Sequence, residues 1–294
     1  MLTERREVSN RFRHWIFLLL GIRLARMWAT RMASEDKAQR ARREIKYLVS
    51  EETALAVRAF VSCYLEPDEF ALGRVDNSYP VHSLYLDSNN LDTYKASFVQ
   101  GMRNRFKLRI RYYDDDPAAP VFFEVKRRIN EGIVKQRARV KRDAVHALLV
   151  GESPTPEHLF GWNMQHWIDL LEFWRHVEMM EAAPRAHNAY MREAYVNAGK
   201  ATVRLTMDRK VRLGPEFGGD LSTDLPNGVE VYAGFVILEL KFTELMPSWM
   251  IEMVRGFDLT TSGAAKYGMG VLLLGEGKVS RRRTGFEWGS SITS

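Results

Sequence analysis

Hydrophobic and charged residues alternate one by one in several short stretches of this chain. In RFKLRIRYY, from Arg105 to Tyr113, cations occupy every second position and mainly apolar residues lie between them. Successive side chains of a strand point to opposite faces of a sheet, so the stretch predicts a strand with one apolar and one cationic face. The same alternation recurs in REIKY (43–47), FFEVKRR (122–128), KQRARVK (135–141) and VRLTMDRK (203–210). One alternating strand is common in any solvated sheet, but this repetition favours a shared charged face.

The remaining patterns divide the chain into strands and helices. Strands are expected at 42–50, 79–88, 105–113, 121–128, 133–142, 189–196, 201–211 and 231–243. Apolar residues with helical spacing predict helices at 51–65, with Ser50 as the N-cap, at 89–101, within 143–183 and at 247–257. The aromatic residues of the third helical region are expected in the core, and GVLLLG (270–275) is either a last strand or a helix end. The close succession of strands between 105 and 142 predicts an antiparallel meander.

These elements predict an α+β fold in one domain, over residues 42–276. The most economical arrangement is an antiparallel β-barrel, closed or nearly closed, whose interior is the charged face and whose apolar outer face packs against helices. Interior cations without partners are costly, so about ten of them imply a polyanionic ligand with several charges. The glutamates among the cations, Glu44, Glu124 and Glu239, fit either ligands of a divalent metal or partners that orient the cations.

Charge separates two terminal segments from this domain. The formal net charge is +6, yet residues 1–43 alone hold eleven Lys/Arg and four Asp/Glu. The rest of the chain is therefore near neutral, which favours a local anion site over a generally basic surface. The basic arm 1–41 contains the apolar run WIFLLLGI (15–22), which fits a membrane-surface helix or, as we favour, an appended segment without a function of its own. Residues 277–294 are expected to form a flexible basic tail.

Other features narrow the class of protein. The single cysteine, Cys63, excludes an intrachain disulfide framework and a cysteine-rich zinc site, and it fits a reducing cytosol. No apolar run reaches the roughly 18 residues of a membrane span. We therefore expect a cytoplasmic protein, with any membrane contact made by the arm. The sequence has no Gly-rich P-loop, so side chains would have to bind a nucleotide.

A series of motifs resembles the catalytic domain of the vacuolar transporter chaperone (VTC) family. In order they are REIKY, SLYLDS, GMRNRFKLRIRYY, FFEVK, IVKQR, YMREAY, VRLTMD and LELKF followed by PSW, and they lie between residues 42 and 272. This family belongs to the triphosphate tunnel metalloenzymes, also called CYTH-like proteins. The resemblance implies a tunnel-shaped antiparallel barrel that binds a triphosphate unit and Mn²⁺ or Mg²⁺. It also implies transfer of the ATP γ-phosphate to a growing polyphosphate chain.

The resemblance implies roles for individual residues. Phosphate contacts and catalytic roles are implied for Lys46, Arg109, Arg111, Lys126, Lys135, Arg192, Arg204, Lys241 and Lys266. The alternation adds Lys107 and Arg137 to the expected substrate contacts. Glu239 takes the position of the family's metal-binding glutamate, and we group Glu124 and Glu44 with it as candidate metal ligands. The expected ligands are ATP, polyphosphate or inorganic triphosphate.

The last family motif departs from the pattern in TSGAAKYG (261–268). Lys266 and Tyr267 are kept, but Ala265 replaces the motif's serine and Gly263 stands where a second lysine is expected. The change affects the expected binding of the terminal phosphate and the expected catalytic rate. It leaves the prediction of a polyphosphate-like ligand intact.

Several functions stay open on the sequence alone. The first is a polyphosphate polymerase-like phosphotransferase, since a cage of cations with a metal suffices to position and neutralise a transferred phosphoryl group. An inorganic triphosphatase or a non-catalytic polyphosphate sensor would use the same cage. A single-stranded nucleic-acid binder would place stacking aromatic residues beside the cations. We expect Phe106, Tyr112 and Phe122 on the opposite face, with Tyr113 as the exception, and therefore expect no nucleic acid.

Overall fold

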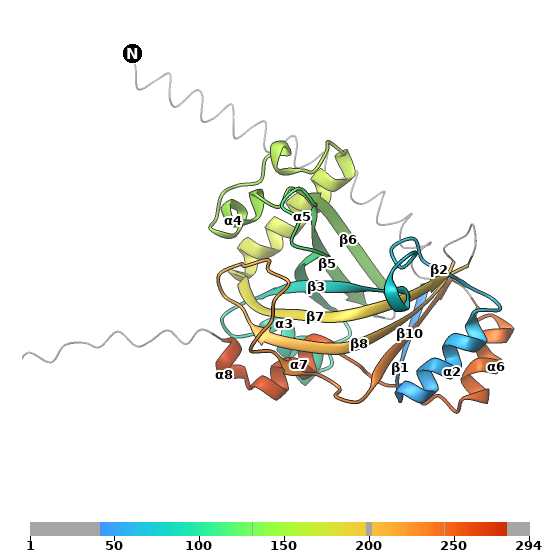
Figure 1. Cartoon of the computed structure of the whole chain (residues 1–294). Coiled ribbons are helices and arrows are strands. Elements are labelled where there is room, and N and C mark those ends of the chain that lie inside the picture. Colours follow the sequence, from blue (N-terminus) through green and yellow to red (C-terminus); the bar gives the residue numbers. More distant parts are fainter. Residues whose placement is uncertain (1–41, 131, 198–201, 244, 281–294) are drawn as a thin grey trace, which may run out of the picture.

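A large antiparallel sheet organises the part of the chain that the computed structural model describes, residues 42–130, 132–197, 202–243 and 245–280 (Figure 1). The strands follow the hydrogen-bonded order β1-β10-β8-β7-β3-β4-β5-β6, with β2 beside β7 and β9 beside β8. Their bounds are β1 Arg42–Val49, β2 Glu66–Pro67, β3 Ser78–Asp87, β4 Arg105–Tyr112, β5 Val121–Ile129, β6 Gly132–Val140, β7 Ala183–Val196, β8 Val203–Pro215, β9 Val229–Glu230 and β10 Val236–Thr243. The expected meander is confirmed in the run from β3 to β6.

The sheet is not closed into a barrel, so the barrel prediction is not confirmed. β1 and β6 end the hydrogen-bonded order, and no pairing joins them within the described ranges. The sheet nevertheless curls, because Lys126 Nζ of β5 lies 3.2 Å from Glu44 Oε1 of β1, near the other end of the order. Closure depends on the summed stagger of all the strands, which local alternation does not specify.

Helices pack around the sheet and position its edges. Their bounds are α2 Glu51–Val61, α3 Asp92–Tyr94, α4 Ala144–Leu149, α5 Met164–Met180, α6 Ser248–Gly256, α7 Lys266–Leu274 and α8 Glu276–Val279, with helical turns η1 Val75–Asn77, η2 Lys95–Val99 and η3 Pro156–His158. In Figure 1, α5 lies beside β5 and β6, while α2 and α6 lie side by side near β1 and β10. The Ser50 hydroxyl accepts a hydrogen bond from the Thr53 backbone N–H at 3.1 Å, as expected for the N-cap of α2. The sequence allowed either a last strand or a helix end for residues 270–275, and the structure places residues 270–274 in α7.

The terminal segments are described only in part. α8 lies at the start of the expected tail, whereas the arm 1–41 lies outside the described residues. Its membrane contact and the cytoplasmic location stay predictions. Among the helices of the described ranges, none combines the length and the apolar character that a membrane span requires.

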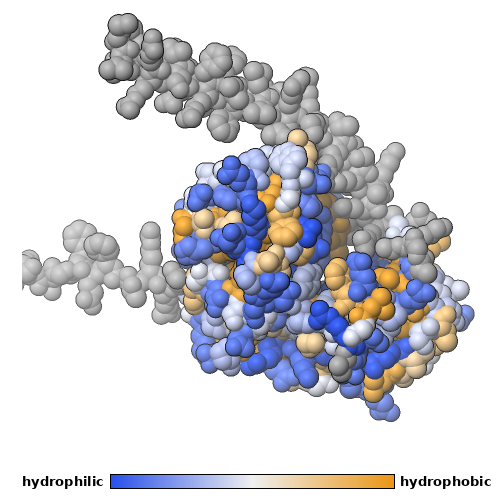
Figure 2. Space-filling model, turned by 45° about the horizontal axis from the view of Figure 1, so that its top comes forward, coloured by the Kyte–Doolittle hydropathy of each residue, from blue (hydrophilic) through white to orange (hydrophobic). Residues whose placement is uncertain are grey.

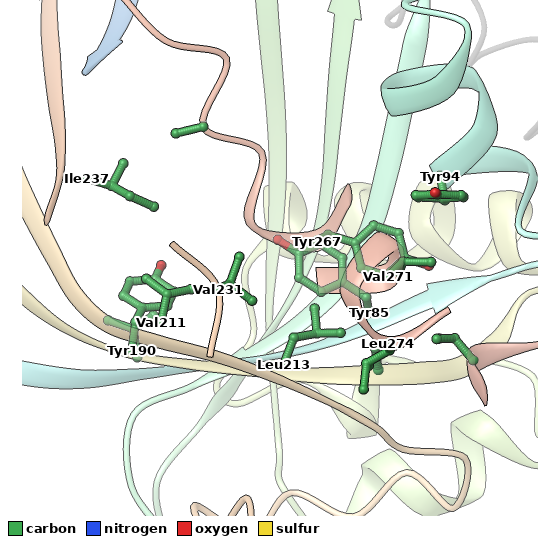
Figure 3. Close-up of a cluster of buried hydrophobic side chains, with 14 of the residues drawn as sticks. Tyr85, Tyr94, Tyr190, Val211, Leu213, Val231, Ile237, Tyr267, Val271 and Leu274 are labelled. Carbon is green, nitrogen blue, oxygen red and sulfur yellow. The ribbon is translucent and has the colours of Figure 1, made fainter. Parts of the chain in front are cut away.

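Three apolar cores fix the two faces of the sheet. Leu108 of β4 is buried with Leu170 and Phe173 of α5. Of the aromatic residues expected in the core, Phe173 is buried, Trp167 and Trp174 are partly buried, and Trp162 is 62% exposed. A second core lies under α2 and α6. The third lies between α7 and the sheet, where Tyr267 of α7 and Tyr85 of β3 stack at 4.5 Å (Figure 3). On the outside, the view in Figure 2 shows hydrophobic patches interspersed with hydrophilic residues.

Candidate functional site

The cations expected at the site lie on one face of the curled sheet, which we call the charged face. They come from seven strands and from the first residue of α7: Lys46, Lys107, Arg109, Arg111, Lys126, Lys135, Arg137, Arg192, Arg204, Lys241 and Lys266. Leu108 and Ile110, which alternate with cations in β4, are fully buried on the other side, in the core with α5. The period-two prediction for β4 is therefore confirmed.

Five carboxylates accompany these eleven cations. They are Glu44, Asp68, Glu124, Asp208 and Glu239, and each forms at least one ion pair with a cation of the charged face. Cations thus outnumber carboxylates by about two to one. Burying a surplus of positive charge without counter-ions is costly in free energy.

Glu124 of β5 is fully buried inside a cage of three cations. Its Oε2 lies 2.7 Å from Arg109 Nη2, and its Oε1 lies 2.6 Å from Lys135 Nζ and 3.2 Å from Arg137 Nε. Burial alone would raise the pKa of Glu124, but Arg109, Arg111 and the other cations hold that pKa well below its ordinary value. Both carboxylate oxygens are therefore committed to cations.

Glu44 of β1 and Glu239 of β10 form a second carboxylate group. Glu44 lies 3.3 Å from Lys46 Nζ and 3.2 Å from Lys126 Nζ, and Glu239 lies 3.1 Å from Lys241 Nζ. Burial alone would raise the pKa of Glu239, but Lys241, Lys46 and a side-chain hydrogen bond with Glu44 hold that pKa well below its ordinary value. The structure thus brings two candidate metal ligands together.

Asp208 of β8 is a counter-ion that the sequence analysis did not single out. Arg192 Nε and Nη2 donate to its two oxygens at 2.7 Å each, and Lys266 Nζ lies 2.7 Å from Oδ2. Burial alone would raise the pKa of Asp208, and the two cations lower it. The signal was present in the sequence, because Asp208 alternates with Arg204 and Thr206 in VRLTMD.

Arg204 is held by a carboxylate far away in the sequence. Its Nη2 lies 2.6 Å from Asp68 Oδ2 and 3.2 Å from the Tyr79 hydroxyl. Asp68 follows the short strand β2, which pairs with β7. No local pattern indicates this contact, because it depends on how β2 joins the sheet.

Lys107 and Arg111 have no carboxylate within ion-pair distance in the part of the chain that the structure describes. Arg111 is buried and donates to the Tyr190 hydroxyl at 3.2 Å. Burial lowers the pKa of Lys107 to about 8; the neighbouring Tyr85 opposes this effect, and the positive charge of Lys46 reinforces it. These two side chains mark the part of the charged face that the protein leaves least neutralised.

Phe122 lies on the charged face, so the prediction that placed it on the opposite face is wrong. It is two residues from Glu124 in β5, and Arg137 Cζ lies 3.5 Å from its ring centroid. The even spacing of Phe122 and Glu124 was readable in FFEVK. Phe106 and Tyr112 do pack with the core under α5, as expected. Because aromatic rings and cations share a face, the absence of nucleic acid stays a prediction.

A divalent metal fits Glu44 and Glu239 better than Glu124. Within the described ranges, no three His, Cys, Asp or Glu side chains form a group that could hold a metal by themselves. Mg²⁺, however, is commonly bound by one or two carboxylates together with substrate phosphates. The adjacent Glu44 and Glu239 meet that requirement once a phosphate is present. Glu124 is the poorer candidate, because three cations surround a single carboxylate and would repel a metal.

The altered family motif lies at the start of α7. Ala265 occupies the N-cap position of this helix and makes no side-chain cap hydrogen bond. A Cβ atom placed on Gly263 would meet no atom within 4 Å. Position 263 therefore has space for the Cβ of a larger residue, and in this chain Lys266 is the motif's remaining cation.

Comparisons with known proteins agree with the motifs. The model of the VTC domain matches residues 41–275. None of the curated proteins matches the chain. Among solved structures, the chain is similar to the one described as "Structure of PH1819 protein from Pyrococcus Horikoshii OT3", with 11% sequence identity, a TM-score of 0.39, and coverage of 79% of this chain and 98% of that one. A likeness at this level carries no argument about function.

Proposed function

The chain belongs to the VTC domain family, and we propose that it is a polyphosphate polymerase-like phosphotransferase that moves the ATP γ-phosphate to a polyphosphate chain. The family indicates a polyphosphate-related function. One observation carries the finer proposal: the charged face holds eleven cations, and Lys107 and Arg111 lack a carboxylate partner among the described residues. A linear oligophosphate would neutralise this surplus through charge-assisted hydrogen bonds.

The cations would act through position and charge. A terminal oxygen of the acceptor chain forms a bond to the γ-phosphorus while the bond to the β–γ bridging oxygen breaks, and ADP leaves with that electron pair. Arg109, Arg111 and Arg192 would hold the phosphate oxygens and offset the charge that shifts during transfer. No side chain has to form a covalent intermediate. The fixed ion pairs of Arg109 and Arg192 keep these guanidinium groups in place before the substrate binds.

A divalent ion, when bound, would neutralise phosphate charge and polarise the transferred group. Glu239 and Glu44 would hold it with carboxylate oxygens, the ligands that Mn²⁺ and Mg²⁺ prefer. Lys241 and Lys46 would keep Glu239 deprotonated and available, because they hold its pKa low.

A second candidate is an inorganic triphosphatase or a non-catalytic polyphosphate sensor. The altered motif favours it, because Ala265 and Gly263 remove a hydroxyl group and a cation from the expected grip on the terminal phosphate. In hydrolysis, water would take the place of the acceptor chain on the same charged face.

The test is to incubate the purified chain with ATP and Mn²⁺ and to assay polyphosphate chains and free phosphate separately. Chain formation supports the polymerase, release of free phosphate supports the hydrolase, and binding without turnover supports the sensor. Arg111→Met removes a cation without leaving a carboxylate unpaired, and it should abolish turnover. Arg255→Met is the matched control and should keep turnover, because Arg255 is exposed in α6, which packs on the apolar side of β10.

A further inference from the structure

An exposed aromatic ring lies at one end of the charged face. Phe70, in the loop after β2, is 59% exposed. Its ring is parallel to that of Tyr113 within 5°, with centroids 6.4 Å apart, and it lies 6.1 Å from the Tyr79 ring. More than half of the Phe70 side chain is therefore open to solvent beside the charged face.

Hydrogen bonds connect this aromatic group directly to cations of the charged face. The Tyr79 hydroxyl lies 3.2 Å from Arg204 Nη2, and the Tyr113 hydroxyl accepts from Arg137 Nη2 at 3.1 Å. The rings are thus fixed beside phosphate-binding side chains by contacts from two strands. A ligand with a flat apolar end and a charged end could use both features at once.

The two ends of β4 have opposite character. Near Tyr113 the charged face is bordered by the aromatic rings of Phe70 and Phe122. At the other end Arg105 lies opposite Arg128, where burial and this neighbouring cation lower the pKa of Arg105. ATP has the same asymmetry, with a planar base at one end and phosphates at the other. Bases stack on aromatic side chains with little dependence on sequence.

We propose that Phe70, supported by Tyr113, is the stacking platform for the purine base of ATP. The base lies on the exposed ring, and the triphosphate runs from Arg204 and Arg137 towards Arg111. This assignment rests on the proposed function, because it takes ATP as the phosphate donor. It adds a base-binding group to a site otherwise defined by phosphate contacts.

Titration calorimetry on the full chain tests the platform with two probes, a non-hydrolysable ATP analogue with an imido bridge and inorganic triphosphate. Phe70→Ala should raise the Kd of the ATP analogue about tenfold, the scale of one lost stacking contact, and should change the Kd of triphosphate less than about twofold. Phe70→Trp should restore analogue binding. Tyr64→Ala is the matched control, since Tyr64 is 46% exposed and stacked on Trp249 of α6, away from the charged face.

The outcomes separate the platform from the proposed function. If Phe70→Ala leaves analogue affinity unchanged, or weakens both probes equally, the platform is wrong while the phosphate site stands. If the unmodified chain binds neither probe, the proposed function fails and the platform fails with it.

Discussion

Two carboxylate groups on the charged face differ in how completely the protein neutralises them. Around Glu124, three cations occupy both oxygens of one buried carboxylate. Around Glu44 and Glu239, two carboxylates lie together and are contacted mainly by lysines. One group has three cations around a single carboxylate, and the other has two carboxylates among three lysines.

The contrast suggests two separate roles on one face, one towards an anion and one towards a metal. A saturated carboxylate orients its cations, so Glu124 holds Arg109 and Lys135 in position for a phosphate. A pair of adjacent carboxylates offers oxygens to a hard divalent cation, which also relieves their mutual repulsion. We therefore expect the two groups to respond differently to the same substitution.

Glu239→Gln should have the largest effect on activity. The amide keeps the shape but removes the charge that would hold the metal, so turnover with Mn²⁺ should fall roughly a hundredfold or more. The Mn²⁺ concentration for half-maximal activity should rise. Steady-state assays over a metal titration measure both quantities.

The matched change in the other group is the control for this prediction. Glu124→Gln should leave the metal concentration for half-maximal activity unchanged. An equal shift in both variants would contradict the division between a metal group and an orienting group.

Glu124→Gln should instead have the larger effect on stability. It leaves Arg109, Lys135 and Arg137 without their buried counter-ion, so the free energy of unfolding should fall by about 4 kcal/mol. Urea unfolding measures this loss. Because the folded state lowers the pKa of Glu124 below its ordinary 4.5, its stabilisation exists above that pH and disappears as the pH falls further. The variant should thus lose less stability on acidification than the unmodified chain, and a parallel loss would contradict the cage.

The unpaired cation Lys107 should couple triphosphate binding to proton uptake. Burial lowers its pKa from 10.5 to about 8. Between these two values the unfolded chain binds a proton that the folded chain does not, so the free energy of unfolding should rise as the pH increases from about 8 to 10.5. A bound anion favours the protonated form, so triphosphate affinity should fall as the pH rises through 8. Calorimetry near pH 8 in two buffers of different ionisation enthalpy measures the uptake.

Lys107→Met should reduce this uptake, whereas Lys278→Met, at an exposed position in α8, should not. A residual uptake is expected from Lys241, whose pKa burial also lowers to about 8, and from Tyr85, whose pKa burial would raise but the neighbouring cations Arg109 and Lys107 lower to about 8. Identical uptake in Lys107→Met and the unmodified chain would show that Lys107 does not contact the ligand.

Ala265→Ser should have the smallest effect. A serine at the N-cap of α7 can accept a backbone N–H that has no side-chain partner now, which should raise the free energy of unfolding by about 1 kcal/mol. Thermal unfolding measures the gain. Ala265→Val, which cannot cap, should not stabilise, and a gain in both variants would point to a cause other than capping.

Much of the charged face could be predicted from alternation alone. Period two assigned Arg109 and Arg111 to one face and Leu108 to the other, because the buried side is fixed by hydrophobicity. The same rule places Phe122 beside Glu124, and the wrong expectation for Phe122 came from grouping aromatic residues by type.

The contacts that hold the cations could not be predicted. Asp68 meets Arg204 across 136 residues, and Glu44 meets Lys126 across 82. Such pairs depend on the curl of the whole sheet, which no short stretch determines. For the same reason, no short stretch of the sequence determines whether the sheet closes into a barrel.

The most direct test of the central claim is a competition for the charged face between two polyanions of equal total charge. Inorganic triphosphate and a single-stranded oligonucleotide each compete with the imido analogue of ATP at physiological salt, monitored by calorimetry. Closely spaced cations match phosphates that are joined directly, whereas nucleic-acid phosphates are separated by sugars, so triphosphate should compete at a roughly hundredfold lower concentration. Lys126→Ala and Arg204→Ala, on separate strands, should both weaken triphosphate binding. If the oligonucleotide competes as well as triphosphate, the charged face is not an oligophosphate site.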